Sequence, residues 1–302
     1  MPQYSAGNVI REVRRRKKIS QEELAYGICS VSTLSKIESS LQNPNRKTFE
    51  AIMNRFGEPI CIYNIPLTEN ELKRSNIERE ITSRVATGNS EIFDLLDEYK
   101  QCGPEMDPLE KQFYLYNLAF YKEDMGEDPK TVLNLHVQAL KLTMPFYKTG
   151  SLLENQLLTF DEIIILNNIA RITYDLGKKV EAIRLLLGLT DYMEKEHIDR
   201  EEKAKKYPML LYNLSTWLGQ NKQYREANDL CDRGIDCCVQ YGKLTHFPLL
   251  IYNKGYSLAA LGDIKAGKKY IRQALTIFEA MGETERAERI RTAVEKTFSI
   301  QF

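Results

Sequence analysis

Apolar residues recur at about every third or fourth position along most of the chain, which is the spacing of one buried face on an α-helix. Near the N-terminus the pattern breaks often, and Val9, Ile10 and Val13 share one face of a short first helix. Behind residue 70 the periodic segments are longer, and a turn with Gly or Asn separates the members of each pair. The pattern predicts an all-α chain with a small N-terminal bundle and a larger body of helix hairpins.

The N-terminal bundle contains the stretch "ISQEELAYGICSVSTLSKIES" (19–39). Ser20 with Glu23 is the signature of a capping box that opens one helix, and Ser30 can cap the next after the break at "ICS". A further helix over 43–57 stops at Gly57. We expect a core large enough to hold a helix-turn-helix. Its apolar members are Val9, Ile10, Val13, Leu24, Ala25, Val31, Leu34, Ile37, Phe49, Ile52, Met53 and Phe56.

The outward positions of the helix that follows Ser30 carry short or basic side chains, which allows a helix to enter a DNA major groove without steric conflict. Gln21, at the start of the preceding helix, is placed to donate to a backbone phosphate, and Arg46 and Lys47, just before the helix that ends at Gly57, would flank that contact. The alternative is a helical bundle that makes only protein contacts. The predicted DNA-binding residues are Gln21, Ser32, Thr33, Ser35, Lys36, Arg46 and Lys47.

Four segments of the body align with one another as internal repeats, at 115–142, 166–189, 211–235 and 251–278. Each reads as a helix, a turn and a second helix, with a fifth, divergent unit at 70–101 and a terminal capping helix at 282–298. Small residues fall where two helices would cross closely. These are Ala170, Ala182, Ala227, Gly255 and Ala274. We predict a right-handed solenoid of about five degenerate helix hairpins, and an unrelated helical bundle is the alternative.

Asn117, Asn168, Asn213 and Asn253 occupy the same place in the first helix of four successive repeats. An asparagine amide both donates and accepts, so a row of them suits an extended peptide backbone. Each asparagine could instead brace its own repeat. Side chains one turn further on share the same face, and Arg171 among them suits a peptide carboxylate. The predicted peptide-binding residues are Asn117, Tyr121, Asn168, Arg171, Asn213, Trp217, Asn253 and Tyr256.

The net charge of zero hides an asymmetry between the two parts of the chain. Residues 1–60 hold ten Lys and Arg against six Asp and Glu, which favours a polyanion partner for this part. No glycine-rich phosphate loop, GxSxG or HExxH motif occurs, and the three histidines lack metal-ligand spacing. The six cysteines are read as reduced thiols. We therefore expect a cytoplasmic protein without enzymatic activity, metal, cofactor or membrane span.

"SQEELA" (20–25), the break and "SKIE" (35–38) resemble the Xre/Cro-type helix-turn-helix family, and the hairpins resemble degenerate tetratricopeptide (TPR) repeats. The first resemblance implies Gln21 on a phosphate, residues from Ser30 to Lys36 near the bases, and Glu38 as an internal charge partner. The resulting division is a DNA-binding domain at 1–60, a linker at 61–70 and a peptide-binding and dimerisation domain at 71–302.

The combination resembles the peptide-pheromone-responsive regulators of Gram-positive bacteria, the RRNPP group, and most of all its PlcR- and NprR-like members. It implies a quorum-sensing transcription factor that binds operator DNA as a homodimer. A short re-imported signalling peptide on the concave face of the repeats would switch it. Two alternatives remain: a Rap-like protein that binds or dephosphorylates a response regulator, and a plain repressor whose repeats only dimerise.

Overall fold

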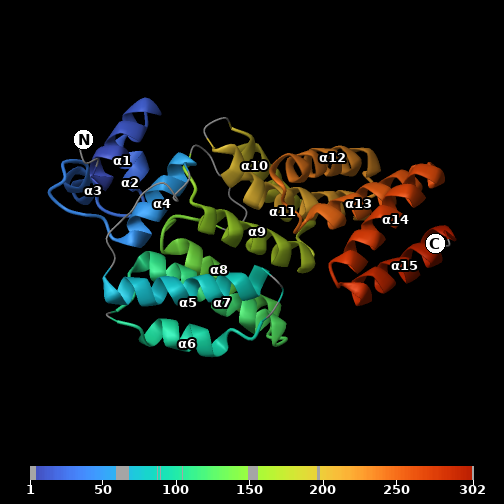
Figure 1. Cartoon of the computed structure of the whole chain (residues 1–302), viewed down its shortest axis with the longest axis horizontal. Coiled ribbons are helices and arrows are strands. Elements are labelled where there is room, and N and C mark those ends of the chain that lie inside the picture. The colour runs from blue at the N-terminus through green and yellow to red at the C-terminus, as the bar shows by residue number, and fades with distance from the viewer. Residues whose placement is uncertain are drawn as a thin grey trace. The chain divides into compact units, whose positions relative to one another are not determined.

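The structure is a computed structural model of the chain. Fifteen helices follow one another in the part that it describes (Figure 1). They divide into two compact units, of which the first is Met1–Gly188 with Lys195–Asp199 and the second is Leu189–Glu194 with Arg200–Phe302. The described residues are 5–58, 68–86, 88, 90–103, 105–148, 156–195 and 198–300, with the side chain of residue 201 left out.

Four short helices form the N-terminal head, which belongs to the first unit. They are α1 (Ala6–Arg16), α2 (Gln21–Ala25), α3 (Val31–Glu38) and α4 (Arg46–Phe56). The capping box that opens α2 is present, because the Glu23 amide donates to Ser20 Oγ at 3.0 Å and the Ser20 amide donates to Glu23 Oε2 at 2.8 Å. Ser30 Oγ accepts from the Thr33 amide at 3.0 Å and opens α3. These local hydrogen bonds explain why such short helices begin where they do.

The core of the head follows the sequence pattern closely. Ile10, Leu24, Leu34, Ile52 and Phe56 are completely buried in one cluster. Val31 was expected in this core, and that prediction is wrong because the first residue of α3 is 38 % exposed. A helix of eight residues turns only one narrow stripe inward, and Leu34 and Ile37 fill it.

Helix hairpins make up the rest of the first unit. They are α5 (Glu69–Ala86) with α6 (Phe93–Gln101), α7 (Pro108–Asp124) with α8 (Pro129–Lys141), and α9 (Phe160–Asp175) with α10 (Lys179–Glu194), whose last six residues fall in the second unit. Capping boxes open α7 at Asp107 and α9 at Thr159. The crossing residues Ala170 and Ala182 are completely buried, as their small size predicts.

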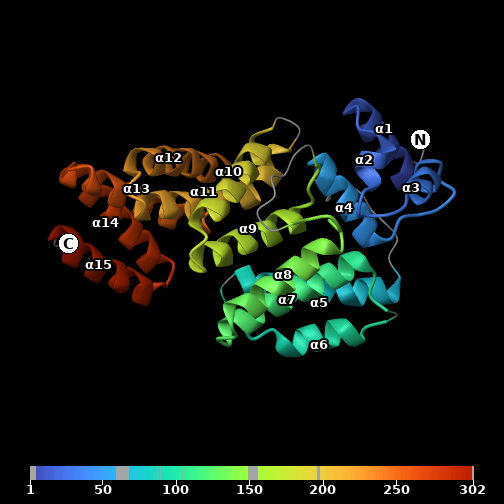
Figure 2. The same cartoon turned by 180° about the vertical axis from the view of Figure 1, so that it is seen from behind.

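The second unit contains two further hairpins and a terminal helix, which Figure 2 shows from behind. They are α11 (Arg200–Gln220) with α12 (Tyr224–Tyr241), α13 (Phe247–Ala260) with α14 (Ile264–Ala280), and then α15 (Thr284–Phe298). Gly255 and Gly267 lie at the crossing of α13 and α14, where an added Cβ on Gly267 would lie 2.8 Å from the Gly255 carbonyl oxygen. Backbones this close leave room for glycine alone.

The predicted all-α order is confirmed: a helix-turn-helix head, five helix hairpins and a terminal helix. Most of the expected linker, 61–67, lies outside the described residues, and α5 begins at Glu69. The division of the chain into domains at 60 and 70 stays a prediction.

Candidate functional site

A buried charge cluster fixes the geometry of the helix-turn-helix. Arg14 on α1 donates to the Glu38 carboxylate at the end of α3 through Nε at 2.6 Å and Nη2 at 2.8 Å. Gln21 Nε2 donates to the same carboxylate at 2.8 Å. Burial alone would raise the pKa of Glu38, but Arg14 and Gln21 outweigh it and the pKa is lowered. Glu38 is thus an ionised internal partner that ties Gln21, at the start of α2, to α3.

The surface of α3 is polar, small and open. Ser32, Ser35 and Lys36 are exposed, while Thr33 is half-buried. Ser30 is exposed too, but its hydroxyl is engaged in the helix cap and lies 2.8 Å from Thr33 Oγ1. A short helix with this surface can lie in a major groove with its N-terminal half against the base edges. Of the predicted base contacts that are exposed, Ser32, Ser35 and Lys36 are the ones whose side chains are not engaged in the helix cap.

Arg46 and Lys47, predicted to flank the phosphate contact, are placed differently. Their side chains are only 13 % and 11 % exposed, and both pair with Glu78 of α5. Burial lowers the pKa of Lys47, but Glu78 outweighs it and the pKa is raised. Both side chains are charged and already neutralised within the protein, so we leave them out of the proposed DNA contacts.

Cations on the first helix were not among the predicted site residues. Arg11 and Arg15 on α1 are exposed, and so is Lys18 in the turn that follows it. Arg11 stands three positions from Arg14 and helps to lower the pKa of Glu38, so this edge of α1 is close to the Gln21 cluster. The spacing of Arg11 and Arg15, four positions apart on a predicted helix, was the signal in the sequence that would have identified this pair.

The predicted peptide-binding residues of the first unit have internal partners. Asn117 is 2 % exposed, and its Nδ2 donates to the Phe113 carbonyl oxygen of the same helix at 2.8 Å. Arg171 donates to the Glu123 carboxylate through both terminal guanidinium nitrogens, with Nη1 at 2.6 Å from Oε1. Asn168 is half-buried. Tyr121 is half-buried, and its ring centroid lies 5.3 Å from that of Phe93.

In the second unit, Asn253 and Tyr256 line one cavity of about 250 Å³. Asn253 Nδ2 donates to Thr216 Oγ1 at 2.8 Å and Ser215 Oγ at 3.0 Å, which connects α13 to α11. Asn213 is half-buried and Trp217 is buried on α11. The remaining lining residues are Ser215, Thr216, Gly219, Gln220, Tyr252 and Ser257. The cavity has an uncharged lining of hydroxyls, amides and two aromatic rings.

The predicted row of four asparagines falls into two pairs, one in each unit. Asn117 and Asn253 both use their amide to brace helices, which is the alternative role for such residues. Asn168 and Asn213 keep a half-buried position. The assignment of these residues to a peptide stays a prediction.

The described residues offer neither a metal-binding cluster nor a membrane-spanning helix. No group of three or more His, Cys, Asp and Glu side chains there is placed to hold a metal ion. Among the helices described, none is long and apolar enough to cross a membrane. Five cysteines are free thiols, and Cys61 and His197 lie outside the described residues.

Residues 10–62 match the protein family HTH_3, described as helix-turn-helix. No curated protein sequence matches the chain. Among solved structures, Bacillus thuringiensis PlcR in complex with the peptide PapR7 and DNA covers 95 % of this chain and 98 % of its own, with 18 % identity and a TM-score of 0.63. PlcR in its apo form covers 94 % and 97 % with 16 % identity and a TM-score of 0.59.

A Rap protein complexed with Competence and Sporulation Factor has a TM-score of 0.50 and 12 % identity, and the match covers 96 % of this chain and 76 % of the Rap chain. At these identities the likenesses show a shared fold. Residues 10–62 therefore form a helix-turn-helix domain, and the chain as a whole has the fold of PlcR.

Proposed function

We propose that this chain, with a helix-turn-helix head on a PlcR-like fold, is a cytoplasmic transcriptional regulator that binds operator DNA as a homodimer. The observation that carries the proposal is the exposed face of α3 beside Gln21, within the segment that matches the helix-turn-helix family. The proposed role is regulatory and non-enzymatic, since binding DNA and a ligand needs no catalytic group.

On DNA, we place α3 in the major groove with Ser32, Ser35 and Lys36 toward the base edges. Gln21, held by Glu38 at 2.8 Å, lies at the start of α2, where helix-turn-helix proteins meet the backbone. Arg11, Arg15 and Lys18 supply positive charge for neighbouring phosphates. This arrangement takes the place of the phosphate contacts predicted for Arg46 and Lys47.

We further propose that a short signalling peptide switches the regulator. The support is the fold shared with PlcR, whose solved complex contains a peptide and DNA, and with a Rap protein solved in complex with Competence and Sporulation Factor. In this chain the cavity that Asn253 and Tyr256 line and the half-buried Asn213, all within the second unit, are the proposed contacts. Arg171 can meet a peptide carboxylate only in exchange for Glu123.

Binding to DNA fragments selected from a random pool tests the proposal by fluorescence anisotropy at several salt concentrations. We expect Lys36→Ala to weaken binding to the selected sequence by about 1–3 kcal/mol. The matched control is Lys130→Ala, which removes an exposed lysine on α8. Selection that enriches no sequence, or a Lys36→Ala protein with unchanged affinity, would contradict the proposed role of α3.

The same assay, repeated with a pool of short synthetic peptides, tests the switch. Peptides that change the affinity of the wild-type protein for DNA should lose their effect on Asn213→Ala, while that variant still binds DNA. A protein that binds DNA but responds to no peptide would favour the plain repressor. Capture of a phosphorylated response regulator without DNA binding would favour the Rap-like alternative.

A further inference from the structure

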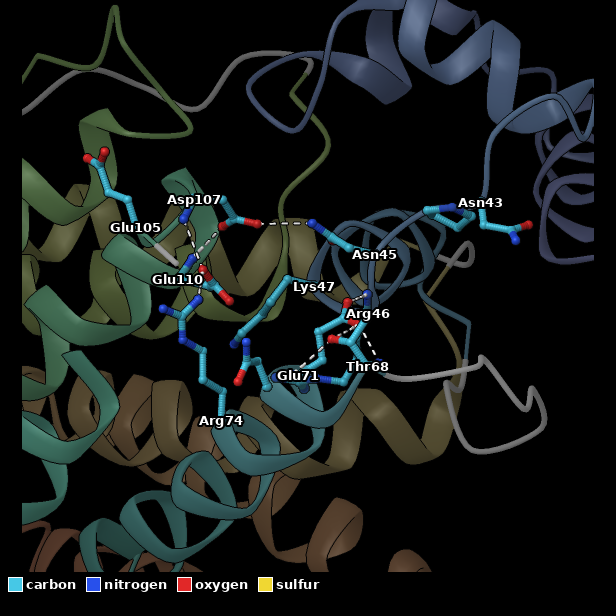
Figure 3. Close-up of a pocket in the computed structure, with 12 residues that line it drawn as sticks. Asn43, Asn45, Arg46, Lys47, Thr68, Glu71, Arg74, Glu105, Asp107 and Glu110 are labelled. Carbon is cyan, nitrogen blue, oxygen red and sulfur yellow. Dashed lines mark hydrogen bonds and ion pairs between the residues drawn. The ribbon is translucent and has the colours of Figure 1, made fainter. Parts of the chain in front are cut away.

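The head contacts the first body helices through an interface that contains buried charges. A cavity of about 600 Å³ lies where the segment before α4 faces α5 and α7. Figure 3 shows the residues that line it. Asn45 Nδ2 donates to Asp107 Oδ2 at 3.1 Å, and the Arg46 amide donates to Glu71 Oε1 at 3.3 Å. All of these residues belong to the first unit, so the interface is internal to one compact body.

Glu78 of α5 is the centre of this interface. Its side chain is 8 % exposed, and its carboxylate pairs with Arg46 and, at 2.9 Å, with the Lys47 ammonium. Tyr99 Oη of α6 donates to it at 2.7 Å. Burial would raise the pKa of Glu78, but Lys47 and Arg46 keep it lowered, so the group is ionised. Lys47 also lies 4.6 Å from the centre of the Phe113 ring on α7, so one side chain of the head meets two body helices.

A second buried ion pair joins the other end of α4 to α9. Arg55 Nη2 lies 3.4 Å from Glu162 Oε1, and the two side chains are 1 % and 0 % exposed. Arg55 Nη1 also donates to the Leu24 carbonyl oxygen of α2 at 3.2 Å and to that of Tyr26. The same guanidinium therefore holds both the helix-turn-helix and a body helix.

The turn between α2 and α3 adds a third contact. Gly27 has a φ of +68°, and a Cβ built there would lie 1.8 Å from the Thr143 carbonyl oxygen, just beyond α8. No side chain fits between these two backbones. Thr143 is itself held by Gln112 Nε2 of α7, which donates to its Oγ1 at 2.7 Å. The turn between α2 and α3 is thus in direct contact with the residue that follows the second hairpin of the body, α7–α8.

From these three contacts we propose that the head is docked on α5–α9 as one rigid element, and that Glu78 is the residue that holds it in register. The consequence of this docking rests on the proposed function: a change in the first hairpins changes the orientation of α3 through these three contacts. Removal of the Glu78 charge leaves Arg46 and Lys47 in a poorly hydrated site without their shared partner, which favours opening of the interface.

The test compares Glu78→Gln with Glu80→Gln in the full chain by amide hydrogen exchange without DNA. Glu80 lies on the same helix but is 51 % exposed and paired with Arg84, so it is the matched control. We expect at least about a tenfold loss of protection in α4 for Glu78→Gln and none for Glu80→Gln. Unchanged protection of α4 in Glu78→Gln would overturn the docking proposal.

Two further variants keep the test decisive. Tyr99→Phe removes only one hydrogen bond to Glu78 and should give a smaller loss of protection in the same helix if Glu78→Gln fails to fold. Glu78→Gln combined with Lys47→Met removes both charges of one pair and should recover protection, since Arg46 retains Glu50 at 2.7 Å. No recovery in the double variant would overturn the assignment of the effect to this ion pair.

Operator binding then separates the two proposals. If the wild-type protein binds DNA, the Glu78→Gln variant should bind its operator about tenfold or more weakly than the wild type, because α3 is no longer held in one orientation. Tighter binding with a steeper salt dependence would overturn the proposal, since it would show that Glu78 masks two phosphate-binding cations. A wild-type protein that binds no DNA contradicts the proposed function, and the exchange data still decide the docking.

Discussion

His136 is a buried histidine on α8 whose Nδ1 finds no hydrogen-bond partner among the described residues. Burial, helped by the nearby charge of Arg171, lowers its pKa to about 3. The side chain is therefore neutral in the folded protein at pH 7 and well below it. Such a residue lowers the stability of the fold as the pH falls, because the unfolded chain binds a proton there and the folded chain does not.

The first prediction concerns this histidine. The unfolded imidazole binds a proton below about pH 6.5 and the folded one does not, so the free energy of unfolding falls as the pH drops through this range. Between about pH 7.5 and about pH 5, wild type should lose about 2 kcal/mol more than His136→Leu. Urea unfolding at both pH values measures the difference, which cancels the titration of other groups. Equal losses in the two proteins would show that His136 is not buried as described.

At the scale of the element, glycine decides how closely two helices approach. A Cβ added to Gly267 of α14 would lie 2.8 Å from the Gly255 carbonyl oxygen of α13, which is too close for a carbon atom. A Cβ added to Gly219 of α11 would have no other atom within 4 Å. Both glycines lie inside helices of the second unit, so the pair separates packing from helix propensity.

We predict that Gly267→Ala destabilises the protein by about 1–3 kcal/mol, because the added methyl forces α13 and α14 apart. Gly219→Ala should stabilise it by about 0.5–1 kcal/mol through helix propensity. Chemical denaturation of both variants measures the two effects. If both changes have the same sign, the α13–α14 crossing does not have the close approach seen here.

Elements of this kind were largely predictable from sequence. Apolar spacing and caps such as Ser20 with Glu23 act within one turn of chain, so the helices and the head core could be derived. Pairing across the fold could not: Lys47 and Glu78 are 31 positions apart and Arg55 and Glu162 are 107 apart. The polar stretch "NRKT" (45–48) therefore predicted an exposed phosphate contact. In the structure its two cations, Arg46 and Lys47, pair with Glu78 of α5 instead.

At the scale of the whole molecule, the chain forms two compact units, and each has its own core. The head cluster around Ile10, Leu34 and Phe56 lies in the first, and a cluster around Ile271, Leu275 and Phe278 lies in the second. The chain's single tryptophan, Trp217, is buried in the second unit. Its fluorescence is therefore a local reporter, whereas far-ultraviolet circular dichroism reports all helices.

We predict that urea unfolding curves from Trp217 fluorescence and from circular dichroism do not coincide, since units with separate cores lose their structure at different denaturant concentrations. A Trp217→Phe protein, which lacks the reporter, provides the baseline for the fluorescence signal. Coincident curves with one midpoint would show instead that the chain unfolds as a single cooperative unit.

The Arg55–Glu162 pair has a consequence for how chains with this head and body can diversify. A head that carries Arg55 cannot be transferred freely to another body. Without Glu162 the transferred head would have a buried guanidinium that lacks its carboxylate partner. If α3 reads DNA as proposed, new DNA specificities arise more readily by substitution on its open face, at Ser32, Ser35 and Lys36, than by exchange of whole heads. Chimaeras that keep Glu162 in the recipient body are the ones that should yield folded protein.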